Sequence, residues 1–331
     1  MRTIALIVLT CLALTACGGD DSSSSPAQAG NGAESTNNGR IGGSDGSGNS
    51  TQTLRYDALP TAADQASFLT LINNEGAKGY RYLGDYFYDA SNGGSQSIFV
   101  NDGAAQIYTY QLQATPTSMT GFVSQANAQG ASGYRFEGPL TYGYLYRKDG
   151  GSSATYTYTT TDLSTNPDAF VAQANGEGQS GYWFLGPMVV GSEQANVYMK
   201  NNVSNATYTY DVVMPTSTVG DFITQANSEG AKGYRSKGKM QFGPLQPTGA
   251  INLSWIYMKD QTQSATFTYQ SAAVQATGAS FVQQLNTFGA QGNAYFGDLP
   301  LGMPSPTASF YFEASNCTSF LCTTLNPLTQ N

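Results

Sequence analysis

The sequence contains no histidine. This absence excludes Ser-His-Asp and Cys-His catalysis, histidine-ligated zinc and the attachment of c-type haem. Basic residues are also scarce, because 14 lysine and arginine residues stand against 22 acidic residues and the net charge is −8. A chain this acidic is not expected to bind nucleic acid or to dock on anionic lipid through its charge. Neither a Walker loop nor a dinucleotide fingerprint occurs, and we predict no catalytic residues, no metal site and no cofactor.

Long hydrophobic runs are missing as well, apart from a short one near the N-terminus. Ile4–Leu14 spans eleven residues, too few to cross a bilayer, and it follows the basic residue Arg2. This pattern is typical of a secretion signal over residues 1–16. The residues Leu14-Thr15-Ala16-Cys17 that end it resemble the lipobox of bacterial lipoproteins. The resemblance implies cleavage after Ala16, diacylglycerol on the Cys17 thiol and acylation of the new N-terminus; the alternative is an ordinary secretion signal with a chance cysteine.

A lipid anchor would hold the chain in the bacterial cell envelope. Several acyl chains, at about 0.8 kcal/mol per buried methylene, make such anchoring effectively permanent. Gly18 rather than aspartate follows Cys17, which in proteobacterial lipoproteins implies sorting to the outer membrane, on its periplasmic or its surface face. The segment that follows, within residues 17–52, is rich in glycine, serine, asparagine and aspartate, and Ile41 is its one large aliphatic residue. Such a segment cannot bury enough surface to fold, so we expect a disordered tether.

Cysteine is scarce too, with four residues in the chain. Cys11 leaves with the signal and Cys17 is lipidated, which leaves Cys317 and Cys322 as a pair. Outside the cytoplasm two nearby thiols usually oxidise, so we predict a disulfide that closes a short loop in a C-terminal tail, residues 315–331. A redox role is disfavoured because the C-x-x-C spacing is absent.

One thirteen-residue pattern occurs five times. It has phenylalanine first, asparagine five residues later, glycine at eight and at eleven, and usually tyrosine at twelve. The copies begin at Phe68, Phe122, Phe170, Phe222 and Phe281. Recurrence every 48 to 59 residues indicates one supersecondary unit used five times. Alternating segments such as Thr155-Tyr156-Thr157-Tyr158 precede the copies and predict strands.

These signals predict an α+β fold of five tandem strand-helix-strand-strand repeats. The repeats are expected at residues 53–103, 104–150, 151–203, 204–262 and 263–314. A fifty-residue unit buries too little to be stable alone, so neighbouring units must share a core. They can do so in an open array or in a closed ring. In a ring, a first strand at 53–56 would pair with a last strand at 309–312, which would remove both exposed edges.

The recurring polar residues have mainly structural interpretations. We expect the first glycine of each copy to end the helix in a left-handed conformation. These glycines are Gly76, Gly130, Gly178, Gly230 and Gly289. We expect the asparagine to bond the backbone of the Gly-x-x-Gly turn. These asparagines are Asn73, Asn127, Asn175, Asn227 and Asn286.

Two resemblances bear on the repeats. The segment Ala126 to Phe136 and its four relatives resemble a small bacterial domain family of unknown function, with a signature close to L-N-x-L-G-A-x-G-W-E-L; this carries no activity over. The count and order of elements, read in permuted phase, resemble the five-bladed α/β-propeller of the pentein superfamily. Pentein enzymes that modify guanidines use cysteine with histidine, and this chain has neither in a matching place, so only the fold is implied.

Two sets of charged residues recur in the repeats. Glu75, Glu177 and Glu229 occupy the same position in three of the predicted helices. They could act as a carboxylate pair that hydrolyses a glycoside. The alternative is that they are solvated, because acids repeated at exposed positions more often belong to the helix surface. Arg81, Arg135 and Arg235 follow the pattern in three repeats and would line a shared surface in a ring, unless they pair with acids or stay solvated.

We therefore predict a non-enzymatic, lipid-anchored extracytoplasmic binding or envelope-structural module. Its expected partners are the bilayer, through acylated Cys17, and an envelope protein or glycan. The alternative is an extracytoplasmic glycan hydrolase that uses paired carboxylates.

Overall fold

The computed structural model describes residues 53–103, 106–243, 253–301 and 307–326, all within one compact unit that spans Gly48–Asn331. The predicted signal (1–16), the predicted lipidation site Cys17 and the predicted tether (17–52) lie outside the described residues. No helix in the described part of the chain is long and apolar enough to cross a bilayer.

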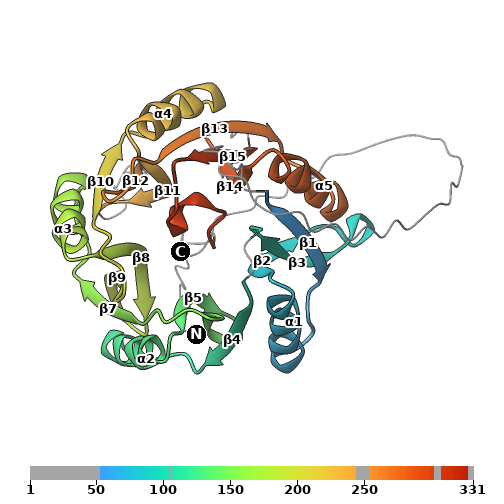
Figure 1. Cartoon of the computed structure of the whole chain (residues 1–331), viewed down its shortest axis with the longest axis horizontal. Coiled ribbons are helices and arrows are strands. Elements are labelled where there is room, and N and C mark those ends of the chain that lie inside the picture. The colour runs from blue at the N-terminus through green and yellow to red at the C-terminus, as the bar shows by residue number, and fades with distance from the viewer. Residues whose placement is uncertain (1–52, 104–105, 244–252, 302–306, 327–331) are drawn as a thin grey trace, which may run out of the picture. The chain divides into compact units, whose positions relative to one another are not determined.

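Strand, helix, strand and strand follow one another five times, so the predicted α+β class and the repeat are confirmed (Figure 1). Unit 1 contains β1 (Arg55–Pro60), α1 (Gln65–Ala77), β2 (Arg81–Phe87) and β3 (Ser95–Asn101). Unit 2 contains β4 (Tyr108–Gln113), α2 (Met119–Ala131), β5 (Arg135–Leu140) and β6 (Gly143–Asp149). Unit 3 contains β7 (Tyr156–Thr161), α3 (Pro167–Gln179), β8 (Tyr182–Val190) and β9 (Glu193–Asn201). Unit 4 contains β10 (Tyr208–Val213), α4 (Val219–Ala231), β11 (Arg235–Gln241) and β12 (Leu253–Asp260). Unit 5 contains β13 (Thr266–Ala273), α5 (Gly278–Gly289), β14 (Asn293–Pro300) and β15 (Thr307–Ser315).

Each unit forms its own three-stranded antiparallel sheet with its last strand in the middle. In unit 1 the order is β1-β3-β2, and the other four units repeat it. The expected pairing of the first strand with the last strand is therefore wrong, because β1 pairs with β3, and β15 lies between β13 and β14. The third strand of each unit returns between the other two, so every sheet is complete without a strand from the far end of the chain.

The ends of the helices follow from short-range chemistry. A side chain caps each N-terminus by accepting a hydrogen bond from the backbone N–H three residues on, which satisfies a donor that the helix leaves unpaired. The caps are Asp64, Ser118, Asn166, Thr218 and Thr277. At the other end our expectation is wrong, because Gly178 lies within α3. The next glycine of the pattern, Gly181, takes the left-handed conformation instead, with φ 86°.

The first glycine of the pattern is needed for the close approach of the next unit. A Cβ atom on Gly178 would lie less than 3.0 Å from the carbonyl oxygen of Tyr208 in β10. The same conflict occurs at Gly76, Gly130, Gly230 and Gly289. Each helix therefore packs on the first strand of the following unit, and α5 packs on β1.

The recurring asparagine joins the same two units. Asn127 Oδ1 accepts a hydrogen bond from Tyr158 N at 2.8 Å, and Asn127 Nδ2 donates to Tyr158 O at 3.2 Å. The expected bond to the turn within the same unit is therefore wrong. The acceptor bond recurs in the pairs Asn73–Tyr110, Asn175–Tyr210, Asn227–Tyr269 and Asn286–Tyr56.

The hydroxyl of each of these tyrosines reaches a β-bulge in the unit that supplies the asparagine. Tyr158 Oη accepts a hydrogen bond from Phe136 N at 2.7 Å, beside the register shift between Phe136 and Gly138. A bulge takes a backbone N–H out of the ladder, and the tyrosine supplies the missing acceptor. The tyrosines that repeat this bond are Tyr110, Tyr210, Tyr269 and Tyr56.

Candidate ligand-binding cavity

The C-terminal tail, residues 316–326, is part of the folded body (Figure 1). It contains the short helix η2 (Phe320–Cys322) and the predicted Cys317–Cys322 disulfide, whose Cα atoms are 5.6 Å apart. The Phe320 ring packs on Trp183 of unit 3, with 4.8 Å between the ring centroids. The tail therefore packs directly on the sheet of unit 3.

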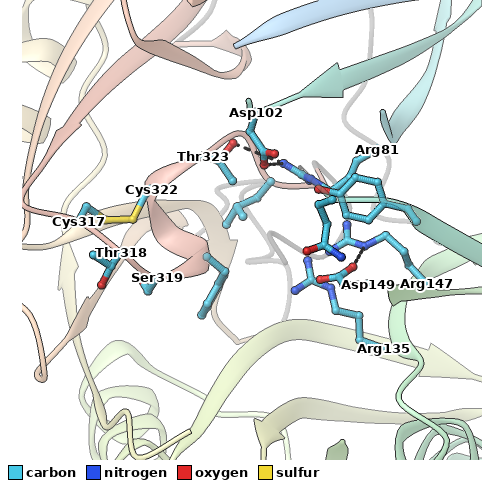
Figure 2. Close-up of a pocket in the computed structure, with 14 residues that line it drawn as sticks. Arg81, Asp102, Arg135, Arg147, Asp149, Cys317, Thr318, Ser319, Cys322 and Thr323 are labelled. Carbon is cyan, nitrogen blue, oxygen red and sulfur yellow. Dashed lines mark hydrogen bonds and ion pairs between the residues drawn. A yellow bond between two sulfur atoms is a disulfide. The ribbon is translucent and has the colours of Figure 1, made fainter. Parts of the chain in front are cut away.

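A cavity of about 300 Å³ lies between this tail and the strands of units 1 and 2 (Figure 2). Its charged lining residues are Arg81, Asp102, Arg135, Arg147 and Asp149. The tail contributes the disulfide, the hydroxyls of Thr318, Ser319 and Thr323, and the apolar side chains of Phe320 and Leu325. None of the recurring asparagines or of the five helical glycines lines it. The recurring asparagines and glycines build the body, and the cavity is lined by other residues, of which Arg81 and Arg135 occupy equivalent places in units 1 and 2.

Arg81 connects unit 1 to the tail. It is the first residue of β2 and is 3% exposed. Its Nη2 lies 3.1 Å from Asp102 Oδ2 and donates to the carbonyl oxygen of Thr324 at 2.8 Å. Removal of Arg81 would therefore break an ion pair of Asp102 and a hydrogen bond of the tail backbone.

Two arginines face each other in the part of the wall formed by unit 2. Arg135 in β5 lies directly opposite Arg147 in β6. Like charges in this position destabilise a sheet unless they are compensated. The buried Glu137 lies between them, with Oε1 3.1 Å from Arg135 Nε and 3.1 Å from Arg147 Nη1. Asp149 Oδ1 accepts a hydrogen bond from Arg147 Nε at 2.8 Å, so the two arginines are matched by two acids.

Both acids that line the cavity are held in the ionised form. Burial raises the pKa of Asp149, but the guanidinium groups of Arg147 and Arg135 outweigh it and lower that pKa to about 2. For Asp102 burial is again the largest influence, yet Arg81 leads the opposing ones and the pKa is lowered. The general acid of a glycosidase needs a pKa raised toward neutrality. Neither Asp102 nor Asp149 meets that requirement.

The equivalent arginine of unit 4 contacts the tail and does not line the cavity. Arg235 is 0% exposed, lies 4.6 Å from the centroid of the Phe312 ring and donates to the carbonyl oxygen of Thr323 at 3.4 Å. Burial lowers the pKa of Arg235 to about 10, so it is protonated at neutral pH. Of the three predicted arginines, Arg81 and Arg135 share the cavity and pair with acids, and all three are buried and not solvated.

The three recurring glutamates do not form a catalytic pair. Glu75 and Glu229 are buried and not exposed as expected, and they form ion pairs with Lys78 and Lys232 at 2.6 and 2.7 Å. The burial of both carboxylates is not revealed by the helix pattern alone. Glu177 is half-buried in a third unit. Among the described residues no hydrogen bond or ion pair joins any two of the three.

Arg147 and Asp149 belong to the cavity, although the sequence analysis does not single them out. A comparison of the third strands of the repeats contains the missing signal. Arg147 lies opposite Arg135, the first residue of β5. The equivalent places in units 1, 3 and 4 are occupied by Val100, Met199 and Met258. One charged residue in a position that is otherwise apolar marks a local function or a local compensation.

No group of histidine, cysteine, aspartate and glutamate side chains within the described ranges could hold a metal ion. The chain matches no protein-family model, no curated protein and no solved structure. The features that bear on function are therefore the cavity and the residues that resemble a lipobox.

Proposed function

We propose that the chain is a membrane-anchored extracytoplasmic lipoprotein whose five-unit body is a non-enzymatic binding module. The cavity between units 1 and 2 and the tail carries this proposal, because it combines buried arginines, ionised aspartates and hydroxyls around a ligand-sized space. The lipobox at Cys17 supports the anchor and Gly18 supports the outer membrane. The proposed partners are the bilayer, through acylated Cys17, and an envelope glycan in the cavity.

We also propose that the five units close into a ring resembling a five-bladed α/β-propeller. The five sheets are separate in the described residues, a property that an open array would share. The ring is supported by the packing of α5 on β1 and by the Asn286–Tyr56 hydrogen bonds, which repeat the contacts between consecutive units. An open array would leave β1 without a preceding helix.

The competing hydrolase hypothesis has weaker support. It needs two carboxylates that share one site, one of them with a raised pKa. Glu75, Glu177 and Glu229 lie in three different units, and the two cavity aspartates have lowered pKa values. If glycan hydrolysis is nevertheless measured, Glu75→Gln, Glu177→Gln and Glu229→Gln should be assayed separately. Loss of hydrolysis in one of them alone would favour an enzyme.

The binding hypothesis is tested with the full-length protein in detergent and fragments of envelope polysaccharide. Thr318→Trp places a large ring in the cavity wall, and Thr109→Trp is the matched control at an exposed position in β4. We expect wild type and Thr109→Trp to bind the fragments and Thr318→Trp to lose at least tenfold in affinity. Equal binding by all three, or release of new reducing ends, would contradict the proposal.

The anchor is tested independently. Cys17→Ser should leave the protein unprocessed or move it from the membrane fraction to the soluble fraction. Membrane retention of a processed Cys17→Ser variant would show that another feature holds the protein.

A further inference from the structure

A large share of the positive charge in the described part of this acidic protein is buried. Five of the 12 lysine and arginine residues in the described ranges are buried, and four of them are arginines. They are Arg81, Arg135, Arg147, Arg235 and Lys237. The cavity lining presents three arginines and two aspartates, and the buried Glu137 that contacts Arg135 and Arg147 balances the third guanidinium. In a chain of net charge −8, this gathering of guanidinium groups is a place where a small anion can find hydrogen-bond donors.

Arg135 has unused hydrogen-bonding capacity that faces the cavity. The residue is 7% exposed, and its one hydrogen bond runs from Nε to Glu137. Its terminal nitrogens, Nη1 and Nη2, have no hydrogen-bond partner among the described residues. Figure 2 shows the guanidinium directed across the cavity toward the tail. These nitrogens are open to the cavity, where the guanidinium fork can donate to an acceptor with two oxygens.

We propose, resting on the proposed function, that the cavity binds a hexuronate, with the sugar carboxylate held by the terminal nitrogens of Arg135. The planar guanidinium fork matches a carboxylate in a bidentate geometry. A doubly charged phosphate fits less well, because Asp102 and Asp149 line the same space as ionised groups.

The rest of the lining suits a sugar ring. Thr318 and Ser319 present hydroxyls, and the two aspartates can accept hydrogen bonds from sugar hydroxyls. Phe320 offers an aromatic surface for the C–H face of a pyranose. A volume of about 300 Å³ lies at the lower end of the range for ligand pockets, so we expect one sugar residue to be enclosed.

The inference is tested by calorimetric titration of the full-length protein in detergent. The probes are glucuronate and galacturonate, their uncharged amides, the neutral hexoses and inorganic phosphate. Acid and amide have almost the same shape, so this comparison measures the charge contribution without any change to the protein. We expect at least one hexuronate to bind at least tenfold more tightly than its amide, and phosphate to bind more weakly than that hexuronate.

Arg135→Gln should reduce the affinity for that hexuronate at least tenfold, with a smaller effect on its amide. Arg55→Gln, at an exposed position in β1, is the matched control and should bind as wild type does. If Arg135→Gln does not fold, the comparison of acid with amide still decides the question. Equal affinity for acid and amide, tighter binding of phosphate, or no binding of either hexuronate would overturn the inference. Binding of neutral polysaccharide that Thr318→Trp abolishes would leave the proposed function standing while the inference fails.

Discussion

The side-chain amide of Asn286 forms two hydrogen bonds with the backbone of Tyr56, 230 residues earlier in the chain, at 2.7 and 2.9 Å. The same pair of bonds joins Asn127 to Tyr158, which are 31 residues apart. A side-chain amide carries an NH2 donor group and a carbonyl acceptor, so it can bond both the C=O and the N–H of an extended residue. The helix of one unit therefore supplies a strand-like contact to the first strand of the next unit. Units 5 and 1 are joined by the same chemistry as units 2 and 3.

Asn286→Ala should destabilise the protein by roughly 2–4 kcal/mol, because the buried N–H and C=O of Tyr56 both lose their partner. The free energy of unfolding is measured by urea denaturation. Asn205→Ala, at an exposed position, is the control and should change it by no more than about 0.5 kcal/mol. Asn127→Ala provides the comparison within the chain. A much smaller effect for Asn286→Ala than for Asn127→Ala would show that units 5 and 1 separate in solution.

Two glycines of α3 should respond oppositely to the same substitution. A Cβ at Gly178 would collide with the backbone of Tyr208, whereas nothing lies within 4 Å of a Cβ at Gly176. Alanine favours an isolated helix by about 1 kcal/mol over glycine. Gly176→Ala should therefore raise the free energy of unfolding by roughly 0.5–1 kcal/mol. Gly178→Ala should lower it by roughly 1–3 kcal/mol, since the helix must move away from β10. Thermal denaturation of the two variants checks this, and a stabilising Gly178→Ala would contradict the packing described.

Much of the fold follows from local signals in the sequence. Capping residues such as Asn166 and alternating strands such as Tyr156–Thr161 act within a few residues, so the order of elements in each unit could be predicted. The role of Gly178 could not be predicted. A glycine that ends a helix and a glycine that allows a neighbouring strand to pack closely look the same in the sequence. The partner of each asparagine lies in another unit, which no local rule identifies.

The candidate site was only partly predictable, for a related reason. Arg81 and Arg135 recur at one place in the repeats and could be proposed for a shared surface. Arg147 opposes Arg135 only in the register of β5 with β6, and that register depends on the bulge after Phe136. The tail lacks any repeat signal, so its position against Arg81 could be found only from the structure.

Low pH should lower the free energy of unfolding, in part because Asp149 becomes protonated. Its folded pKa is about 2, below the value of about 3.9 for an unfolded aspartate. The group therefore stabilises the fold above about pH 4, and this contribution is lost as the pH falls through the folded pKa. The full shift corresponds to roughly 2 kcal/mol. Between pH 5 and pH 2, wild type should lose about that much more free energy of unfolding than Asp149→Asn. Equal losses in the two proteins would contradict the assignment of the lowered pKa.

The buried charges of Glu137 and Arg147 should make unit 2 less stable than an apolar pair would. Unit 3 has apolar residues at the same two places and shows which substitutions test this. At the places of Glu137 and Arg147, unit 3 has Leu185 and Met199, both buried in its apolar core. Glu137→Leu alone leaves Arg135 and Arg147 opposite each other and should lower the free energy of unfolding by about 3–5 kcal/mol.

The double variant Glu137→Leu, Arg147→Met removes a charge of each sign and copies the apolar pair of unit 3. Replacement of a buried ion pair by well-packed apolar residues is often neutral or stabilising. We therefore expect the double variant to recover part of the loss, less what Asp149 loses with its Arg147 partner, as measured by urea denaturation in a double-mutant cycle. A double variant as unstable as Glu137→Leu would mean that the network stabilises the fold. Recovery would mean that the charges are kept at a cost in stability, as expected if they serve the cavity and not the core.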